Sequence, residues 1–484
     1  MEPITSVDLV NIYLDEIERH NGYLKAVICT APRKGLEQQA SQLDEARRAG
    51  RLRSRLHGIP ILIKDNVATH PSLGMETTAG ALALRGSKPK CNADIVDKLI
   101  DAGAIIIGKA NLSELGFFKG EGLPCGWSMV GGQTQSAYVR GGVQPDDTPG
   151  GHSNPTGSSS GSAVAVSAGL CPVSIGTETA GSLVEPSSRA ALYTIRATPG
   201  LIQQKGIVPL SSLFDTAGPI TKSVVDLADL MDILVNGPST DNLERSYRSY
   251  ITKSWADIGV AAVNPSIWKL PESFCRPVPA IDEQLVAEYE RAYRKIESLA
   301  RNFRGNVPLP TTEALQMNDG PAFKKVCDES KVRSLEELVA FNKAHPGEQT
   351  FPSNSQQSFL EAGLNHKWTD KDVNEALTFM RRVARDEGID KILQDSGADV
   401  IIGPANSGLP TIAAAAGYPI ATLPLGYADY NGRPFGLAAI ARAHQEGTLI
   451  RLQSAWEVTF EPRFQVPKSQ RFWPSDEKVI QHHS

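Results

Sequence analysis

The stretch that decides the fold is residues 157–182, which read GSSSGSAVAVSAGLCPVSIGTETAGS. It opens with a glycine and serine run, continues into a small-residue helix over 163–168 that Gly169 can end, and enters an apolar strand at Val173. That strand breaks into a second loop of small residues ending at Ser182. Because such residues leave the backbone accessible, the N–H groups of the second loop can converge on one point.

Upstream of this stretch lies an apolar strand that ends in a lysine, Gly58-Ile-Pro-Ile-Leu-Ile-Lys-Asp-Asn66. Its position at the strand end predicts that Lys64 emerges where the sheet meets a cleft. A lysine at such a place is either the buried partner of Asp65 or a base. The residues alone leave both interpretations open.

Further outward, short apolar runs alternate with helical stretches, which is typical of an α/β fold. We therefore predict one mixed, mainly parallel β-sheet covered by helices on both faces. Strands are expected at 59–63, 104–107, 173–175, 399–402, 419–425 and 435–440, and helices at 5–20, 94–102, 375–395, 410–416 and 446–460. A further helix is expected to start at Asn111, with Glu114 completing a capping box.

Residues 237–374 have a different composition, with charged helices such as 283–304 and a polar stretch over 353–357. Because both flanks share the same alternation, we predict a single domain over 1–484. In this interpretation 237–374 is a variable helical insertion that covers the sheet and forms part of the substrate face.

Composition excludes several classes of function. The chain has 484 residues, 41% hydrophobic and 21% charged, which is too apolar for a disordered protein. A net charge of -5 argues against nucleic acid or an anionic membrane as a partner. The first residues lack a secretory signal and no apolar run is long enough to span a membrane, so we expect a soluble, cytoplasmic protein.

The sequence predicts no metal site and no cofactor. Its six cysteines are far apart, without CxxC pairs, and are expected to be reduced thiols. The nine histidines form no HExxH pair, and His482 and His483 stand in the tail.

Two motif matches, one to a phosphate loop and one to the GxSxG motif of α/β-hydrolases, are rejected because their neighbouring residues do not fit. Residues 103–109 fit most of a phosphate loop, but Ala110 replaces the hydroxyl residue and the intervening residues are a buried strand. Residues 157–161 fit GxSxG with Ser159 as nucleophile, but that motif needs an apolar strand before it, and residues 150–156 cannot form one.

Taken together and in this order, the strand-end lysine, the Gly/Ser run, the small-residue helix and the loop ending Gly-Ser resemble the amidase signature family of serine hydrolases. The resemblance extends to 4–10, 108–114, 131–134, 215–219, 404–407 and 416–419. It covers roughly 1–236 and 375–465, whereas 237–374 carries nothing diagnostic.

The resemblance implies a role for each residue of the motif. Lys64 falls on the catalytic lysine and Ser182 on the acylating serine. The bridging serine falls on Ser158, which lies 24 residues before Ser182, the separation that the resemblance implies. The substrate's oxyanion is expected to meet the backbone N–H groups of the 179–182 loop, contributed by Thr179, Ala180, Gly181 and Ser182.

We therefore predict a stand-alone amidase that hydrolyses a small-molecule carboxamide through an acyl-enzyme. Acyl transfer, amide formation or ester hydrolysis by the same acyl-enzyme stays an alternative, as does a glutaminase-type amidotransferase subunit that needs partner subunits. A catalytically silent scaffold is disfavoured because all three catalytic positions are filled. Neither the substrate nor the oligomeric state can be read from the sequence, and a homodimer stays open.

One departure from the family pattern lies close to Ser182. Three positions further on, Glu185 stands where a basic or small polar residue is common in the family, just before Pro186. We expect Pro186 to open a helix running through 189–193. Glu185 then either stabilises the start of that helix or faces the cleft and selects a cationic or hydrogen-bond-donating substrate.

Overall fold

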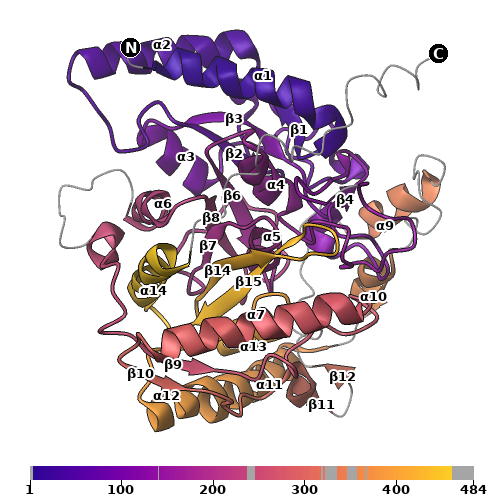
Figure 1. Ribbon diagram of the computed structural model, residues 1–484. Helices are drawn as coiled ribbons and strands as arrows, with labels where there is room; N and C mark the ends of the chain where they lie inside the picture. Colours follow the sequence, from indigo (N-terminus) through magenta and orange to yellow (C-terminus); the bar gives the residue numbers. More distant parts are fainter. Residues whose placement is uncertain are drawn as a thin grey trace.

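A single large sheet runs through the part of the chain described by the computed structural model, residues 4–139, 141–236, 246–317, 320–321, 335–345, 357–365 and 368–460. Its eleven strands follow the order β1-β3-β2-β6-β8-β7-β14-β15-β13-β9-β10 (Figure 1). Their bounds are β1 (Val27–Thr30), β2 (Pro60–Lys64), β3 (Ile105–Ala110), β6 (Val173–Glu178), β7 (Tyr193–Arg196), β8 (Thr216–Thr221), β9 (Gly259–Ala262), β10 (Asn302–Arg304), β13 (Val400–Pro404), β14 (Ile420–Tyr427) and β15 (Pro434–Ile440). Two small hairpins lie apart from it, formed by β4 (Trp127–Ser128) with β5 (Gly132–Gln133) and β11 (Gln316–Met317) with β12 (Gly320–Pro321).

The predicted mixed α/β sheet is confirmed, and its parallel pairs lie in two blocks. One block is β3-β2-β6, which carries the strand-end lysine and leads into the loop ending at Ser182. The other is β13-β9-β10. The strands between the blocks pair antiparallel, so parallel pairing is less continuous than the alternation of elements indicates.

Helices cover both faces of this sheet, and most of those that the periodicity predicts occur close to the predicted ranges. Their bounds are α1 (Ser6–Leu24), α2 (Arg33–Arg48), α3 (Asp94–Asp101), α4 (Ser160–Ala168), α5 (Val184–Ser188), α6 (Val224–Asn236), α7 (Pro279–Glu297), α9 (Leu335–Ala344), α10 (Ser358–Asn365), α11 (Asp370–Met380), α12 (Lys391–Ser396), α13 (Leu409–Ala416) and α14 (Glu446–Thr459). A π-helical segment, Arg381–Asp390, joins α11 to α12. In Figure 1, α1 and α2 lie at the end of the molecule opposite α12.

Side-chain alternation along the strands explains how one sheet serves two cores. In β15, Leu437 and Ala439 pack with α6, α7 and α14, whereas Ala438 and Ile440 pack with the α11–α13 region. Successive side chains point to opposite faces of a strand, so strands buried on both faces read as continuous apolar runs. A third core, around α1, α2, α3 and α4, holds the β3-β2-β6 block.

Residues 237–374 do more than cover the sheet. Their described part includes the predicted charged helix, which is α7, but also β9 and β10, which extend the sheet at its edge. The insertion, which was expected to be helical, thus contributes two edge strands as well as helices. Both strands are only three to four residues long, too short for a period-two pattern to stand out from the sequence.

Two local predictions are wrong. No α-helix follows Asn111, because the Asn111 amide instead donates to the carbonyls of Lys25 and Gly132, and Glu114 forms a buried ion pair of 3.0 Å with Lys119. The helix near Pro186 is the short α5, which starts at Val184 and ends before Arg189. By contrast, α4 ends at Gly169 in the left-handed conformation, as predicted.

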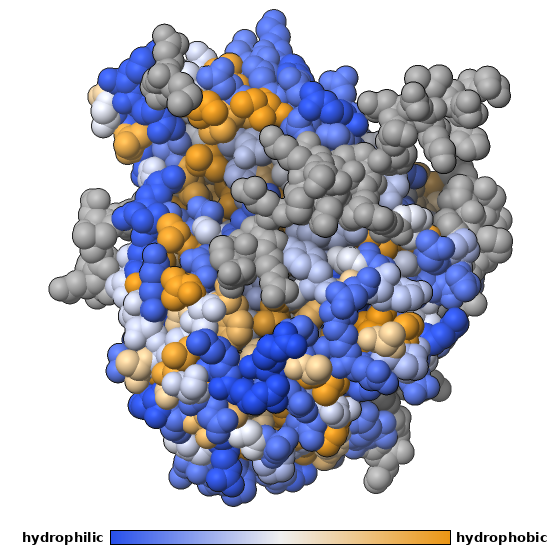
Figure 2. Space-filling view, viewed as in Figure 1, coloured by the Kyte–Doolittle hydropathy of each residue, from blue (hydrophilic) through white to orange (hydrophobic). Residues whose placement is uncertain are grey.

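Much of the face seen in Figure 2 is hydrophilic, with apolar side chains in several separate groups. Within the described residues, no helix is both long and apolar enough to cross a membrane.

Candidate active site

Lys64 ends β2 with a fully buried side chain, and its ammonium contacts the Gly/Ser-rich stretch. Its Nζ donates to Ser158 Oγ at 2.8 Å and to the carbonyl of Thr177 at 3.1 Å. The parallel pairing of β2 with β6 sets this geometry, because both strands end at the same edge of the sheet. Two segments separated by almost a hundred residues thus meet at one point.

The structure also identifies the partner of Asp65, which is not Lys64. The nearest ammonium to Asp65 is that of Lys109, with Nζ at 3.8 Å from Oδ1, and Lys109 donates in addition to Val67 and Thr77. Asp65 Oδ2 accepts from Thr78 and Gly80. Since Lys109 and this hydrogen-bonded turn compensate Asp65, the ammonium of Lys64 is directed to Ser158 instead.

The three consecutive serines have distinct surroundings. Ser158, which follows a cis peptide bond, is the one whose hydroxyl meets Lys64. The Ser159 hydroxyl donates to the carbonyl of Thr177 and accepts from its N–H, and the Ser160 hydroxyl donates to the carbonyl of Thr156. Both latter side chains are therefore engaged with backbone, which leaves Ser158 facing the pocket.

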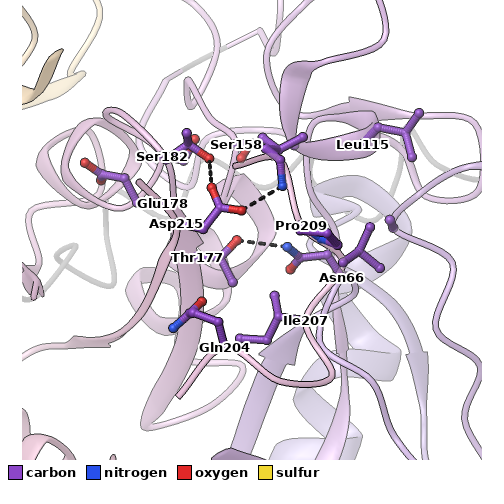
Figure 3. A pocket seen from close by; sticks show the side chains of 15 residues that line it. Asn66, Leu115, Ser158, Thr177, Glu178, Ser182, Gln204, Ile207, Pro209 and Asp215 are labelled. Atoms are coloured by element: carbon purple, nitrogen blue, oxygen red, sulfur yellow. Dashed lines mark hydrogen bonds between the residues drawn. The ribbon is translucent and has the colours of Figure 1, made fainter. Parts of the chain in front are cut away.

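Ser182 lies in the loop between β6 and α5 and lines the same pocket as Ser158 (Figure 3). The two segments are tied together by a backbone hydrogen bond of 3.1 Å from Ser159 N–H to the Ser182 carbonyl. Among the described residues, no hydrogen bond joins the Ser158 and Ser182 hydroxyls. The first link of the predicted series Lys64–Ser158–Ser182 is thus present as a direct contact, and the second is not made in this state.

The backbone N–H groups of the 179–182 loop have no acceptor among the described residues, although the loop is held on both sides. Its carbonyls are used, since Gly181 accepts from Glu185 N–H and Ser182 from Ser159 N–H. Gly181 adopts a left-handed conformation, with φ of +93°, which an L side chain rarely adopts. The loop therefore presents free donors next to Ser182, an arrangement suited to receiving an oxyanion.

Glu178 is a site residue that the sequence analysis did not single out. Its Oε2 accepts from the N–H groups of Leu183 and Val184 at 2.6 and 3.0 Å, and its Oε1 lies 3.5 Å from Arg196 Nε. Both side chains of this ion pair are fully buried. The carboxylate holds the first turn of α5, directly after Ser182, in place.

The pocket beside Ser158 and Ser182 has a volume of about 20 Å³, room for one or two water molecules. Its walls are apolar at 115–116 and 207–210, and its polar lining includes Asn66, Thr177 and Asp215, which the sequence left unassigned. Asn66 donates to Thr177 Oγ1 at 3.0 Å (Figure 3), and Asp215 accepts from Thr179 Oγ1 at 2.5 Å. These polar side chains stand at strand ends, a position that could have signalled them.

The electrostatics of Lys64 suit a base. Burial lowers the pKa of Lys64 to about 7, although Glu178 and Asp215 attract its positive charge and so act to raise the pKa. Desolvation disfavours the ammonium form, and the two carboxylates only partly offset it. Burial also raises the pKa of Asp215.

Glu185 is turned toward Thr156, whose hydroxyl donates to Oε2 at 3.0 Å. Its carboxylate also lies against Gly181, where an added Cβ would be 2.8 Å from Oε1. Burial raises the pKa of Glu185 to about 7, although Arg189 one turn further on attracts its charge. Glu185 is not among the described residues that line the Ser158–Ser182 pocket.

Across the described part of the chain, no group of three or more histidine, cysteine, aspartate or glutamate side chains is placed to hold a metal ion. The described cysteines are free thiols, as expected: Cys29, Cys91, Cys125, Cys171 and Cys275. Cys327 and the two tail histidines, His482 and His483, lie outside the described residues.

Comparison with known proteins bears on the whole chain. Residues 8–411 match the family model described as Amidase. A probable amidase of Arabidopsis thaliana is 31% identical, with 94% of this chain and 86% of that protein covered, and a subunit of the glutamyl-tRNA(Gln) amidotransferase of Staphylococcus saprophyticus is 28% identical, with 94% of each chain covered. The crystal structure of the peptide amidase of Stenotrophomonas maltophilia superposes with a TM-score of 0.77 at 32% identity, covering 94% of this chain and 93% of that one.

Proposed function

Because this chain belongs to the amidase family and is a hydrolase of carbon–nitrogen bonds, we propose that it cleaves a small carboxamide through an acyl-enzyme on Ser182, with Ser158 as bridge and Lys64 as base. The observation that carries the proposal is the 2.8 Å contact between the buried Lys64 Nζ and Ser158 Oγ, at the pocket that Ser182 lines. A lysine deprotonates a hydroxyl only when it is itself neutral, and its desolvated position provides for that.

The proposed reaction needs no group beyond these side chains and water. Ser182 Oγ attacks the amide carbon while its proton passes to Ser158 Oγ, whose own proton moves to neutral Lys64 Nζ. As the tetrahedral intermediate collapses, the proton returns along the same path to the leaving nitrogen, and the amine departs. Water then attacks the acyl-enzyme with the same proton path, which releases the acid and restores Ser182.

One feature supports this assignment of roles, and one further contact is expected to form with substrate. The carbonyl oxygen becomes negative in the tetrahedral state, and the unengaged N–H groups of the 179–182 loop lie next to the attacking residue. The Ser158–Ser182 hydroxyl contact, absent in this state, is expected to close when a substrate orders the pocket, because catalytic hydrogen bonds often tighten only in the complex.

The described part of 237–374 supports a role in the substrate face. Leu338, Val339 and Leu360, from α9 and α10, belong to the same buried apolar cluster as Leu115 of the pocket wall. Phe359 stacks on Phe118 with ring centroids 5.6 Å apart. This segment therefore backs the wall of the pocket, and we propose that it shapes which acyl groups enter.

The experiment is to trap the acyl-enzyme. The purified chain is mixed with a panel of small carboxamides, peptide amides and esters, quenched, digested and examined by mass spectrometry. The adduct is expected on the peptide containing Ser182, and it should vanish in Ser182→Ala. Ser212→Ala, which removes an exposed hydroxyl beside the pocket loop, is the matched control and should retain the adduct. An adduct on Ser159, or one that survives in Ser182→Ala, would overturn the proposal.

A second candidate, a glutaminase-type amidotransferase subunit, is favoured by the 28% identity to the Staphylococcus saprophyticus protein. Glutamine hydrolysis that appears only with added partner subunits would support it. Turnover of simple amides by the chain alone argues for the stand-alone amidase. Acyl transfer is separated from hydrolysis by adding hydroxylamine and measuring hydroxamate against free acid.

A further inference from the structure

A second cavity, of about 70 Å³, lies apart from the Ser158–Ser182 pocket and shares none of its lining residues. It is formed where His152, Arg189 at the end of α5, the segment 265–277, α7 and residues at the ends of β13 and β15 meet. The residues that matter chemically are His152, Arg189, Cys275, Tyr289, Asn406 and Arg433.

Arg433 is the unusual member of this cavity. Its side chain is only 2% exposed, yet its guanidinium donates no hydrogen bond to any described residue, and its Nε has no exposed surface through which water could reach it. A guanidinium carries five N–H donors and stays charged at neutral pH, so such burial without a partner is costly. Arg433 therefore lacks the anion that a buried arginine normally faces.

Arg189, also 2% exposed, adds a second charge close by. It donates to the carbonyls of Gly150, Gly151 and Asn154, but its Nε has no acceptor in the part of the chain that the structure describes. Burial and the charge of Arg189 lower the pKa of Arg433 to about 10, which indicates two mutually repelling cations. Neither forms an ion pair with a described carboxylate.

The acids in the neighbourhood are already engaged elsewhere. Asp147 accepts from Thr148 and Ser153, and Glu185 accepts from Thr156. Asp282 and Lys269, which also line the cavity, pair with each other at 3.2 Å and cancel in charge. Among the side chains that line the cavity, the two arginines are therefore left without an opposite charge, while Asp147 attracts Arg433 from outside the lining.

One neutral donor adds to the lining. Asn406 Nδ2 is buried without an acceptor among the described residues, whereas His152 Nε2 donates to the Arg276 carbonyl at 3.0 Å and its Nδ1 carries no proton. Burial and the two arginines lower the pKa of His152 to about 4, so this ring is neutral at pH 7. A cavity in which the Arg433 guanidinium and the Asn406 amide N–H₂ group lack acceptors, beside the positive charge of Arg189, matches the requirements of a planar, multi-acceptor oxyanion.

From this geometry we propose that the Arg189–Arg433 cavity binds a small oxyanion of the carboxylate class. The anion accepts from Arg433 and Asn406 and neutralises the pair of arginines. Because Arg189 holds the carbonyls of the segment that leads through Thr156 to Ser158, an occupied cavity also stabilises the chain entering the catalytic pocket. The anion is either free in solution or a carboxylate carried by the amide substrate.

Thermal unfolding of the purified full chain tests the proposal without relying on turnover. Acetate, malonate and inorganic phosphate are titrated at fixed ionic strength. A saturable rise in Tm is expected for the wild type, with the apparent Kd weakened about tenfold or more in Arg433→Met, because charge-assisted hydrogen bonds to the anion are lost. Without anion, Arg433→Met should unfold at the same temperature as the wild type or higher. Arg51→Met, a change at an exposed arginine, should behave as the wild type.

A second variant keeps the test decisive if Arg433→Met fails to fold. Asn406→Asp places a carboxylate inside the cavity, so it should raise Tm and abolish the response to acetate. An acetate response that is unchanged in Arg433→Met or Asn406→Asp, or one that only follows ionic strength, overturns the proposal.

Paired amides with and without a distal carboxylate then separate the two sources of the anion. A loss of kcat/KM in Arg433→Met confined to the carboxylate-bearing amide assigns the site to the substrate. An equal effect on both amides, with acetate still raising the Tm of Ser182→Ala, assigns it to a free anion.

Discussion

At the residue scale, the site depends on how two adjacent ionisable side chains, Lys64 and Asp65, find different partners. The sequence could place both at a strand end but could not decide whether they pair, because that depends on a third residue 44 positions away. Lys109, in the neighbouring strand β3, compensates Asp65. Long-range pairing of this kind is invisible to periodicity, which reads only local spacing.

The desolvated lysine predicts how activity depends on pH. Since burial lowers the pKa of Lys64 to about 7, the neutral base accumulates as pH rises through that value. We expect kcat/KM to fall about tenfold for each pH unit below the pKa of Lys64 and to level off above it. The measurement is a pH profile on a neutral amide whose own ionisation does not interfere, and a rate that is flat between pH 5 and 8 would contradict the assignment of Lys64 as base.

The lowered pKa of Lys64 also makes the free energy of unfolding depend on pH. The unfolded chain binds a proton at Lys64 up to its ordinary pKa near 10.4, whereas the folded chain loses it above about 7. Between these values the unfolded state binds more protons, so the wild type gains stability as pH rises. Lys64→Met is inactive by the proposed mechanism and lacks this ionisable group. Its free energy of unfolding, measured in urea, should therefore exceed that of the wild type most near pH 7 and by less near pH 10. A gap that widens with pH would contradict this linkage.

A variant of Glu185 can distinguish a role in substrate selection from a structural role. Its contact with Thr156 and its position outside the lining of the catalytic pocket favour a structural role. We expect Glu185→Gln to keep the ranking of amine-bearing over neutral amides and to change the free energy of unfolding by about 1 kcal/mol or less. Paired kcat/KM values on the two kinds of amide decide it, since a loss confined to the amine-bearing amide would assign substrate selection to Glu185.

At the scale of elements, the loop from β6 to α5 is only partly predictable. The run of small residues correctly indicates a tight loop, and Gly169 correctly marks the end of α4. The predicted start of α5 at Pro186 is wrong because the Glu178 carboxylate accepts from the N–H groups of Leu183 and Val184 and so begins the helix earlier. A side chain that caps a helix from within the preceding strand has no fixed sequence spacing.

Glu178→Gln should therefore damage both stability and catalysis. The change removes the negative partner of the fully buried Arg196, and breaking a buried pair in this way costs about 3–5 kcal/mol. It also leaves the loop of Ser182 less well held, so kcat should fall more than KM rises. The double variant Glu178→Gln/Arg196→Met should recover part of the stability but not the activity. Recovery of both together would show that Glu178 acts on folding alone.

At the scale of the whole molecule, the family and the α/β architecture follow from the sequence because a long motif and the alternation of short apolar runs with helical stretches indicate them. The contribution of residues 237–374 to the sheet does not follow from the sequence. β9 and β10 are recognisable only from their partner β13, and parallel neighbours contributed by distant segments have no local signature. Likewise, the unpaired arginines of the second cavity, Arg189 and Arg433, come from different parts of the chain and meet only in the fold.

The prediction of one domain over the chain can be tested where the sheet is narrowest. β7 joins the two halves, with only two residue pairs to β8 and two to β14. The Thr422 hydroxyl reinforces this junction, since Oγ1 donates to the Leu192 carbonyl at 2.8 Å and accepts from Thr194 N–H at 2.9 Å. A separate unfolding of the halves would have to begin at this junction.

Thr422→Val keeps the shape of this side chain but leaves the buried N–H of Thr194 and carbonyl of Leu192 without their partner, a loss of about 1–3 kcal/mol for each unsatisfied group. If the chain unfolds as one unit, hydrogen exchange in denaturant should report the same lowered midpoint in peptides spanning 60–64 and 434–440, because β2 and β15 then open together. Thr378→Val removes an exposed hydroxyl on α11 that bonds only within its own helix, so both midpoints should stay unchanged. A shift confined to 434–440, or two separate transitions in the wild type, would divide the chain into two domains at β7, since loss of the junction would then leave the β3-β2-β6 block intact.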